Sequence, residues 1–136
     1  MDCIICAIVE GRLPAQKIYE DKDNVAFLDS HPAAPGHTLL VPKAHVARIE
    51  ELTNDEAKAL FQVLHKLLEP IRTALSADAT TIGINNGPGS GQEIRHIHIH
   101  IIPRHRGDHG GIIQSIGPGG KTDPMDAAEK IRARLL

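Results

Sequence analysis

The chain has 136 residues and a mass of 14.7 kDa, which suits one domain that buries its own core. Fifteen Lys and Arg against 17 Asp and Glu give a formal net charge of −2, which argues against nucleic acid as the main partner. No apolar run approaches the roughly 20 residues that cross a bilayer, and no secretory signal is visible, so we expect a cytoplasmic protein without a membrane partner. Nine histidines stand beside two Phe, one Tyr and no Trp, which makes histidine the residue type in which to look for chemistry.

The first forty residues predict a short helix or turn followed by strands. An apolar head leads to a turn that ends at Pro14, and a strand is expected from about Lys17. The apolar runs 25–29 and 38–41 are separated by a loop with two prolines and a glycine, which predicts a hairpin-like pair with a long connection.

One long amphipathic helix is predicted next. Thr53 lies three residues before Glu56, a pattern in which the two side chains satisfy free N–H groups at a helix start. Apolar residues then recur at steps of three and four over 57–75. Pro70 falls inside this stripe and is expected to kink the helix or end it early.

The second half predicts two more strands and a glycine-rich tail. A strand at 81–85 enters a loop over 86–92, and residues 96–102 alternate His and Ile until Pro103 prevents a continued central strand. Gly and Pro are frequent from Arg104 to Gly120, which predicts an ordered surface segment or a mobile flap. Asp123 and Pro124 then favour the start of a last short helix through Leu135.

The alternating segment predicts a site on one face of a strand. Successive side chains of a strand point to opposite faces, so His96, His98 and His100 share one face at a spacing of about 6.6 Å, and isoleucines share the other. Neutral imidazoles can ligate a metal or attack phosphorus as nucleophiles, and both interpretations are open at this point.

The loop upstream favours an anion. Gly87, Gly89 and Gly91 let backbone N–H groups approach a phosphate closely. Three neutral donors are added by Asn85, Ser90 and Gln92.

These segments together resemble the histidine triad (HIT) nucleotide hydrolases and transferases. Gly91-Gln92 followed by residues 96–102 is similar to the family signature. Further segments agree in order: Cys3-Ile4-Ile5-Cys6 with 11–19, Phe27-Leu28-Asp29, Ala34-Pro35-Gly36-His37, Val41-Pro42-Lys43-Ala44-His45, and Pro103-Arg104.

The resemblance covers roughly residues 3–107. We therefore expect a HIT domain over 1–107 and a C-terminal tail with a short helix over 108–136 that belongs to the same domain. The resemblance implies an α+β fold, with an antiparallel sheet and one long helix, paired into a homodimer; the short C-terminal helix expected from Asp123 and Pro124 completes the predicted architecture. The apolar head and the wide helical stripe independently suggest apolar surface left over for such a contact.

The resemblance also implies the catalytic residues. His98 matches the nucleophile that attacks the α-phosphate of a nucleotide and becomes transiently nucleotidylated. His100 matches a residue that contacts the phosphate, His96 completes the triad, and Gln92 matches a residue near the leaving group. Many relatives carry Ser or Thr after that glutamine, where this chain has Glu93, which puts the leaving-group preference in question.

Four further residues match substrate contacts. His37 matches a phosphate contact, and Asn85 matches a contact to phosphate or ribose. Asp29 matches the acid that accepts hydrogen bonds from ribose hydroxyls, with a turn cap as the alternative. Phe27 lies where the family packs the base, with a plain core residue as the alternative.

Cys3 and Cys6 form a Cys-x-x-Cys pair, which favours metal or redox use over a structural disulfide. Some HIT relatives complete a zinc site with histidines that match His45 and His96, so the resemblance implies a structural zinc and no organic cofactor. The alternative is that both thiols are reduced and buried.

The main hypothesis is a hydrolase that cleaves at the α-phosphate of nucleoside phosphoramidates or dinucleoside polyphosphates, with a purine nucleotide as substrate. One alternative is a metal-dependent hydrolase or metal-binding protein in which the strand histidines hold one ion. Another is a nucleotide-binding regulator whose activity is vestigial.

Overall fold

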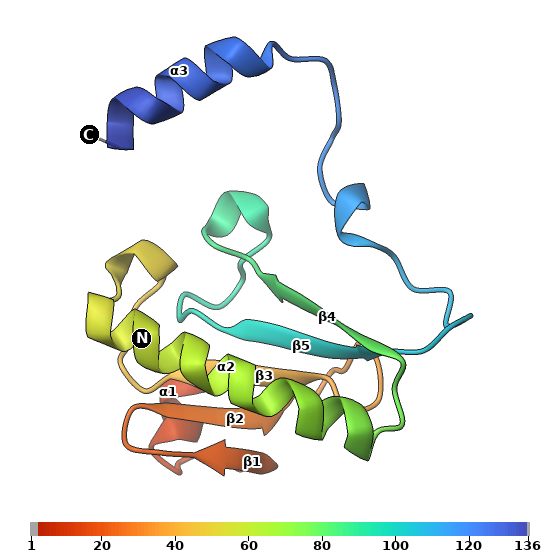
Figure 1. Cartoon of the computed structure of the whole chain (residues 1–136). Coiled ribbons are helices and arrows are strands. Elements are labelled where there is room, and N and C mark those ends of the chain that lie inside the picture. Colours follow the sequence, from red (N-terminus) through yellow and green to blue (C-terminus); the bar gives the residue numbers. More distant parts are fainter. Residues whose placement is uncertain (1–2, 136) are drawn as a thin grey trace.

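The computed structural model describes residues 3–135 as an antiparallel sheet with helices on both faces (Figure 1). Five strands lie in the order β1-β2-β3-β5-β4, and every neighbouring pair is antiparallel. The strands are β1 (Lys17–Glu20), β2 (Asn24–Leu28), β3 (Thr38–Pro42), β4 (Ala79–Ile84) and β5 (Ile99–Arg104). The helices are α1 (Ile4–Val9), α2 (Asn54–Ala74) and α3 (Pro124–Leu135), with short 3-10 turns η1 (Ile49–Glu51), η2 (Pro88–Ser90) and η3 (Ile113–Ser115). The predicted α+β class is confirmed.

The alternation of side chains along the strands makes two apolar cores. On one face, residues such as Ala26, Leu40 and Ile99 pack beneath α2. On the other face, Phe27 and Leu39 of β2 and β3 pack with α1. Because α1 has only six residues, its core draws on β2 and β3, and the β5–β4 half of this second face is left for other groups.

Helix α2 begins as the sequence predicts and continues further than expected. The Thr53 hydroxyl accepts from the Glu56 N–H at 3.1 Å, and the Glu56 carboxylate accepts from the Thr53 N–H at 2.8 Å. Of the two outcomes expected at Pro70, the early end is wrong, because the helix runs on to Ala74, and the kink stays a prediction. Pro70 is exposed, so water can serve the carbonyl that loses its helical partner.

Strand β5 starts later and ends later than the alternating pattern suggested. Its ladder begins at Ile99, so His96 and His98 precede it, and it includes Pro103, which pairs with Thr80 of β4. The ladder with β3 stops at Ile101, so β3 offers no partner beside Pro103. At Pro103 the strand is therefore paired on one side only, which agrees with the expectation that this proline prevents a continued central strand.

The tail separates into a part that contacts the sheet and a part that does not. The Arg104 guanidinium donates to the Gly111 carbonyl at 2.7 Å, which holds the first part against β5. Helix α3 starts after Asp123, whose carboxylate accepts from the Met125 N–H, as predicted. It buries no side chain and stands apart from the sheet in Figure 1. Assignment of the whole tail to the same domain stays a prediction.

No helix within residues 3–135 has the length and apolar character needed to cross a membrane.

Candidate active site

His98 lies just before β5 with its proton position set by the backbone. Its Nδ1 lies 2.8 Å from the carbonyl oxygen of His96. A carbonyl can only accept, so in the neutral imidazole Nδ1 carries the proton and Nε2 has a free lone pair. His98 is 9% exposed, and its ring lies 5.0 Å from that of His100 between centroids. The residue expected to be the nucleophile therefore presents a basic nitrogen to the site.

His100 and His37 form a chain whose proton positions follow from a single backbone donor. The Ala33 N–H donates to Nδ1 of His37 at 2.9 Å, so the proton of a neutral His37 must lie on Nε2. That Nε2 lies 2.9 Å from Nδ1 of His100 and donates to it. A neutral His100 must then carry its own proton on Nε2.

Burial keeps these two rings neutral. The pKa of His100 is lowered to about 4, first by burial and then by the neighbouring His98 and His37. Burial also lowers the pKa of His37, against the opposing effect of the Asp29 carboxylate. The Nε2 of His100 is buried without a hydrogen-bond partner among the described residues. Such a donor is costly unless something accepts from it, so the cluster is prepared for an acceptor.

Asp29 lies where β2 ends, next to this chain. One carboxylate oxygen accepts from the His31 N–H at 2.9 Å, and the other lies 3.7 Å from Nε2 of His37. The turn-capping role and a free second oxygen are therefore both present. Phe27, two residues earlier, is 3% exposed and lies in the core beside α1, which favours the alternative reading of that residue.

The glycine-rich loop is a closed turn rather than an open cradle. The Gly87 N–H donates to the Gln92 side chain at 2.8 Å, and the Gln92 amide donates to the Ala47 carbonyl at 2.7 Å. The Ser90 hydroxyl donates to the Gly87 carbonyl at 2.7 Å. Three donors expected to face a phosphate, on Gly87, Ser90 and Gln92, are thus already bonded to other groups of the protein. The side chain of Gln92 links the loop to Ala47 and so stabilises the shape of the loop.

Other residues around this loop are more available. Within residues 3–135 the half-buried side chain of Asn85 has no hydrogen bond, so it can still meet a ligand. Glu93 is exposed. A side chain at Gly87 would strike the Arg48 guanidinium, a close approach between segments far apart in the sequence that no local pattern indicates.

His96 belongs to a second cluster with both cysteines. Its Nδ1 lies 3.5 Å from the sulfur of Cys3, 3.5 Å from that of Cys6 and 3.2 Å from Nδ1 of His45. The sulfur of Cys6 lies 3.3 Å from Nδ1 of His45. His96 donates from Nε2 to the Pro42 carbonyl at 2.8 Å, which leaves its Nδ1 lone pair facing the sulfurs. The four residues that the sequence combined are therefore brought together.

The three histidines of the alternating segment do not converge on one point. Two groups of possible metal ligands occur among the described residues: Cys3 with Cys6, His45 and His96, and Asp29 with His37 and His100. His96 and His100 fall into different groups, and His98 into neither. The hypothesis of one ion held by all three is wrong, because the backbone before β5 turns His96 toward the cysteines.

An antiparallel sheet with His100 on β5, His98 directly before that strand and His37 beside them, together with a cysteine-histidine cluster around His96, defines a histidine-triad protein. The model of the HIT domain matches residues 10–107. The chain belongs to the HIT family.

Relatives and solved structures agree with this assignment. An uncharacterized HIT-like protein of Methanocaldococcus jannaschii is 44% identical over 130 residues, 96% of this chain and 98% of that protein. An adenylylsulfatase of Arabidopsis thaliana is 37% identical over 107 residues, 79% of this chain and 54% of that protein. A HIT family member from Bacillus subtilis superimposes with a TM-score of 0.86 at 35% identity, covering 100% of this chain and 99% of that one. A zinc-bound histidine triad family protein from Mycobacterium smegmatis gives 0.75 at 33% identity, covering 99% and 94%.

Proposed function

We propose that the protein is a HIT-type hydrolase that cleaves at the α-phosphate of nucleoside phosphoramidates or dinucleoside polyphosphates, with His98 as the nucleophile. The observation that carries the proposal is the hydrogen bond from Nδ1 of His98 to the His96 carbonyl. It leaves Nε2 unprotonated and fixed in direction, which is what a nitrogen nucleophile requires at neutral pH.

The reaction follows from this arrangement in two steps. The Nε2 of His98 attacks the α-phosphorus, a P–N bond forms, and the bond to the leaving group breaks as that group takes a proton from solvent and departs. Water then attacks the same phosphorus and the P–N bond breaks, which releases the nucleoside monophosphate and the free imidazole and returns a proton from the water to solvent.

The neighbouring histidine supplies the complementary charge stabilisation. His100 offers a buried Nε2–H with no acceptor of its own among residues 3–135, and its pKa of about 4 keeps it a neutral donor. A donor held in place before the reaction can stabilise charge that develops on a non-bridging phosphate oxygen. Because Nε2 of His37 donates to Nδ1 of His100, the proton of the neutral His100 stays on its Nε2. Asp29 can accept hydrogen bonds from the ribose hydroxyls.

Adenylylsulfatase activity in the Arabidopsis thaliana relative supports a hydrolase that acts on an adenylated substrate. Intact-mass analysis tests the proposal directly. The protein is mixed with adenosine 5′-phosphoramidate, quenched rapidly and weighed. An adenylylated parent chain and an unmodified His98→Ala chain are the expected result. If the parent turns over substrate without any adduct on His98, the covalent route is wrong, and tight nucleotide binding without turnover would favour the vestigial regulator.

We also propose that Cys3, Cys6, His45 and His96 would hold a structural zinc. Tetrahedral zinc with bonds of about 2.0 to 2.3 Å separates its ligand atoms by roughly 3.3 to 3.8 Å. Four of the six separations here are 3.2 to 3.5 Å, and all of the ligand atoms lie within 4.8 Å of one another. Burial and the adjacent Cys3 raise the pKa of the Cys6 thiol to about 11, so its thiolate form needs a nearby cation. The zinc-bound histidine triad family protein from Mycobacterium smegmatis supports zinc as the metal. Elemental analysis of protein purified without chelator should give one zinc per chain.

Finally, we propose a homodimer. Helix α2 leaves Phe61 41% exposed beside its buried stripe, and β4 is an edge strand, which pairing would cover. Light scattering at micromolar concentration should give twice the 14.7 kDa mass of the chain, and a mass near the single value would exclude the dimer under those conditions.

A further inference from the structure

We infer that Cys3 and Cys6 form an oxidisable modification site, which a peroxide converts to a disulfide and which thereby controls how firmly His98 is held. The chain contains only these two cysteines, and both are free thiols. The consequence for catalysis rests on the proposed function, because it requires that the His98 imidazole carries the reaction. The oxidation and its effect on the position of His98 do not depend on that function.

The two sulfurs lie close enough to be joined. The ligand atoms of the cluster, both sulfurs included, lie within 4.8 Å of one another. Cys3 is the N-cap of α1, and the Cys6 N–H donates to the Cys3 sulfur at 3.3 Å. Residues three apart in a helical turn have Cα atoms about 5 Å apart, and disulfides join Cα atoms that are roughly 4.4 to 6.8 Å apart. A bond between the sulfurs therefore needs rotation of the side chains and little movement of the backbone.

A small oxidant can reach the sulfurs from solvent. Cys3 and Cys6 are half-buried and His45 beside them is exposed, whereas His96 is fully buried. The cluster is thus open on the side of His45. A peroxide needs to reach only one sulfur, because the second sulfur then reacts with the first within the chain.

The oxidation takes two steps, with hydrogen peroxide as the oxidant. One sulfur attacks a peroxide oxygen, the O–O bond breaks, and a sulfenic acid forms while the other oxygen leaves as water. The second sulfur attacks the first, the S–O bond breaks, and the hydroxyl group leaves as a second water. The two sulfurs lose two electrons in total and the peroxide gains them. The two thiol protons complete the two waters, and solvent supplies them where the sulfurs are thiolates.

A disulfide removes both sulfurs from the cluster. In the reduced protein each sulfur lies 3.5 Å from Nδ1 of His96, and the sulfur of Cys6 lies 3.3 Å from Nδ1 of His45. The thiolate is the form that binds a metal, so joined sulfurs are no longer ligands. Two histidines alone do not make the four-ligand set of a structural zinc site. Oxidation therefore unties the N-terminal segment from the segment before β5.

The backbone that orients His98 depends on this tie. The three residues before β5 precede its ladder, so other contacts must hold them. The His96 ring donates to the Pro42 carbonyl and the Ile97 N–H donates to the Val46 carbonyl, both at 2.8 Å. The remaining contacts of the His96 ring are those to the cysteine cluster. When these are lost, the His96 carbonyl gains freedom, and Nδ1 of His98 loses its fixed acceptor.

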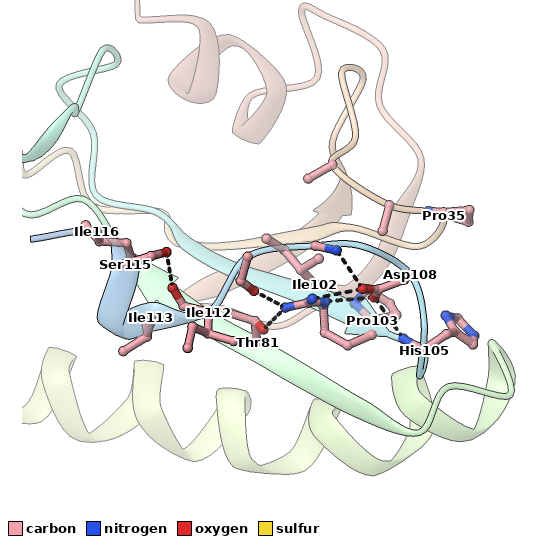
Figure 2. Close-up of a pocket in the computed structure, with 15 residues that line it drawn as sticks. Pro35, Thr81, Ile102, Pro103, His105, Asp108, Ile112, Ile113, Ser115 and Ile116 are labelled. Carbon is pink, nitrogen blue, oxygen red and sulfur yellow. Dashed lines mark hydrogen bonds and ion pairs between the residues drawn. The ribbon is translucent and has the colours of Figure 1, made fainter.

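The other end of β5 is anchored by groups that a peroxide leaves unchanged (Figure 2). The Arg104 guanidinium makes two bonds of 2.9 Å with the Asp108 carboxylate and one of 2.7 Å with the Gly111 carbonyl. These bonds hold the tail against the strand, where Ile112 and Ile113 line a pocket. Peroxide attacks the sulfurs of Cys and Met, and this anchor consists of nitrogen and oxygen atoms. Oxidation should therefore loosen the start of β5 and spare its end.

Peroxide treatment of the purified parent protein tests the modification site. Intact-mass analysis should show the loss of two hydrogen atoms, and peptide mapping should join Cys3 to Cys6. Zinc bound to the parent should be released in the same proportion, as measured with a chromogenic chelator. A thiol reductant added together with zinc should reverse these changes.

Two further measurements on the same samples test the link to His98. In 15N NMR spectra the ring of His98 should change from one neutral tautomer, with the proton on Nδ1, to a mixture of both, while the Arg104 side-chain signals stay in place. Turnover of adenosine 5′-phosphoramidate should slow by roughly tenfold, because a displacement of about 1 Å can cost about a hundredfold in rate.

Two variants separate the disulfide from other oxidation. Cys3→Ser cannot form it, so peroxide should leave the His98 signals and the kcat of this variant at their own untreated values. Met125→Leu removes a competing sulfur on a residue that is 71% exposed, and it should respond as the parent does. If Cys3→Ser fails to fold, the mass, the peptide map and the NMR spectra of the parent and of Met125→Leu still decide the question.

Three results would overturn the inference. They are oxidation of Met125 while both cysteines stay reduced, a disulfide between chains in place of one within the chain, and an internal disulfide that leaves the His98 signals unchanged. Failure of the proposed function looks different, because the untreated parent would then show no turnover and no adduct on His98 while the changes in mass and NMR spectra still occur. A parent without zinc would contradict the zinc proposal alone.

Discussion

His96 and His98 are the same side chain two positions apart, yet the protein gives them opposite roles. His96 donates from Nε2 to the Pro42 carbonyl and presents Nδ1 to two sulfurs. His98 donates from Nδ1 to the His96 carbonyl and presents Nε2 to the open side. Which ring nitrogen is free thus depends on which carbonyl lies beside the ring.

The comparison also shows that the two regions are connected. The carbonyl that orients His98 belongs to His96, whose ring lies in the cysteine cluster. A structural cluster at one end of the segment can therefore hold the backbone that orients the chemical group at the other. Predictions that affect one region and spare the other test this division of roles.

Replacing His98 with Ala has the largest expected effect. It removes the nitrogen that forms the covalent bond, so kcat should fall by about a thousandfold or more. Affinity for adenosine monophosphate should change little, because ribose and phosphate contacts lie elsewhere. Stopped activity assays give kcat, and titration calorimetry on the same preparation gives the affinity for adenosine monophosphate. His65→Ala, on the exposed side of α2, is the matched control; retained turnover in His98→Ala would remove the residue from its role.

Replacing Cys3 with Ser should act on stability first. The zinc site would tie the N-terminal segment to the segment before β5, so the loss of one ligand lowers the free energy of unfolding. A decrease of about 2 kcal/mol lowers Tm by roughly 5 °C or more in a domain of this size. Differential scanning calorimetry measures Tm, and elemental analysis of the same sample measures the bound zinc. Ile4→Ser, at a neighbouring position that is 55% exposed, should leave Tm nearly unchanged. Equal shifts in the two variants would argue against a metal centre.

Replacing Asp29 with Ala should weaken ribonucleotide binding by about 1 to 3 kcal/mol, the value of a hydrogen bond to a charged group. Isothermal titration with adenosine monophosphate measures the loss. The same titration with the 2′,3′-dideoxy nucleotide is the control, because that ligand has no ribose hydroxyls to lose. An unchanged dissociation constant for adenosine monophosphate would remove Asp29 from ribose recognition.

The last prediction concerns pH. The pKa of His100 is about 4 in the folded protein against an ordinary value of 6.5, so between these values the unfolded chain binds more protons. The stability from neutral His100 is therefore full above about pH 6.5 and is lost as pH falls toward about 4. Urea unfolding across this range should show the decline, and His100→Gln should flatten it. An equally steep decline in the variant would assign it to other groups.

Local patterns predicted much of this molecule. The apolar steps over 57–75 and the Thr53–Glu56 pair predicted α2, because helical periodicity and capping depend on residues close in sequence. The alternation of His and Ile placed Ile99 and Ile101 in the core, because successive side chains of a strand point to opposite faces and this pattern also depends on residues close in sequence. The ordered motifs identified the HIT family before any geometry was known, and they led to the proposal of His98 as the nucleophile.

The tertiary structure decided how those residues are used. It turned His96 toward Cys3 and Cys6, closed Phe27 into the core, and carried β5 through Pro103. It also joined Arg104, Asp108 and the tail isoleucines into a pocket wall. Each of these outcomes depends on which carbonyl, strand or side chain from a distant segment lies opposite. Such proximity is set by the packing of the whole chain, and short-range patterns do not contain it.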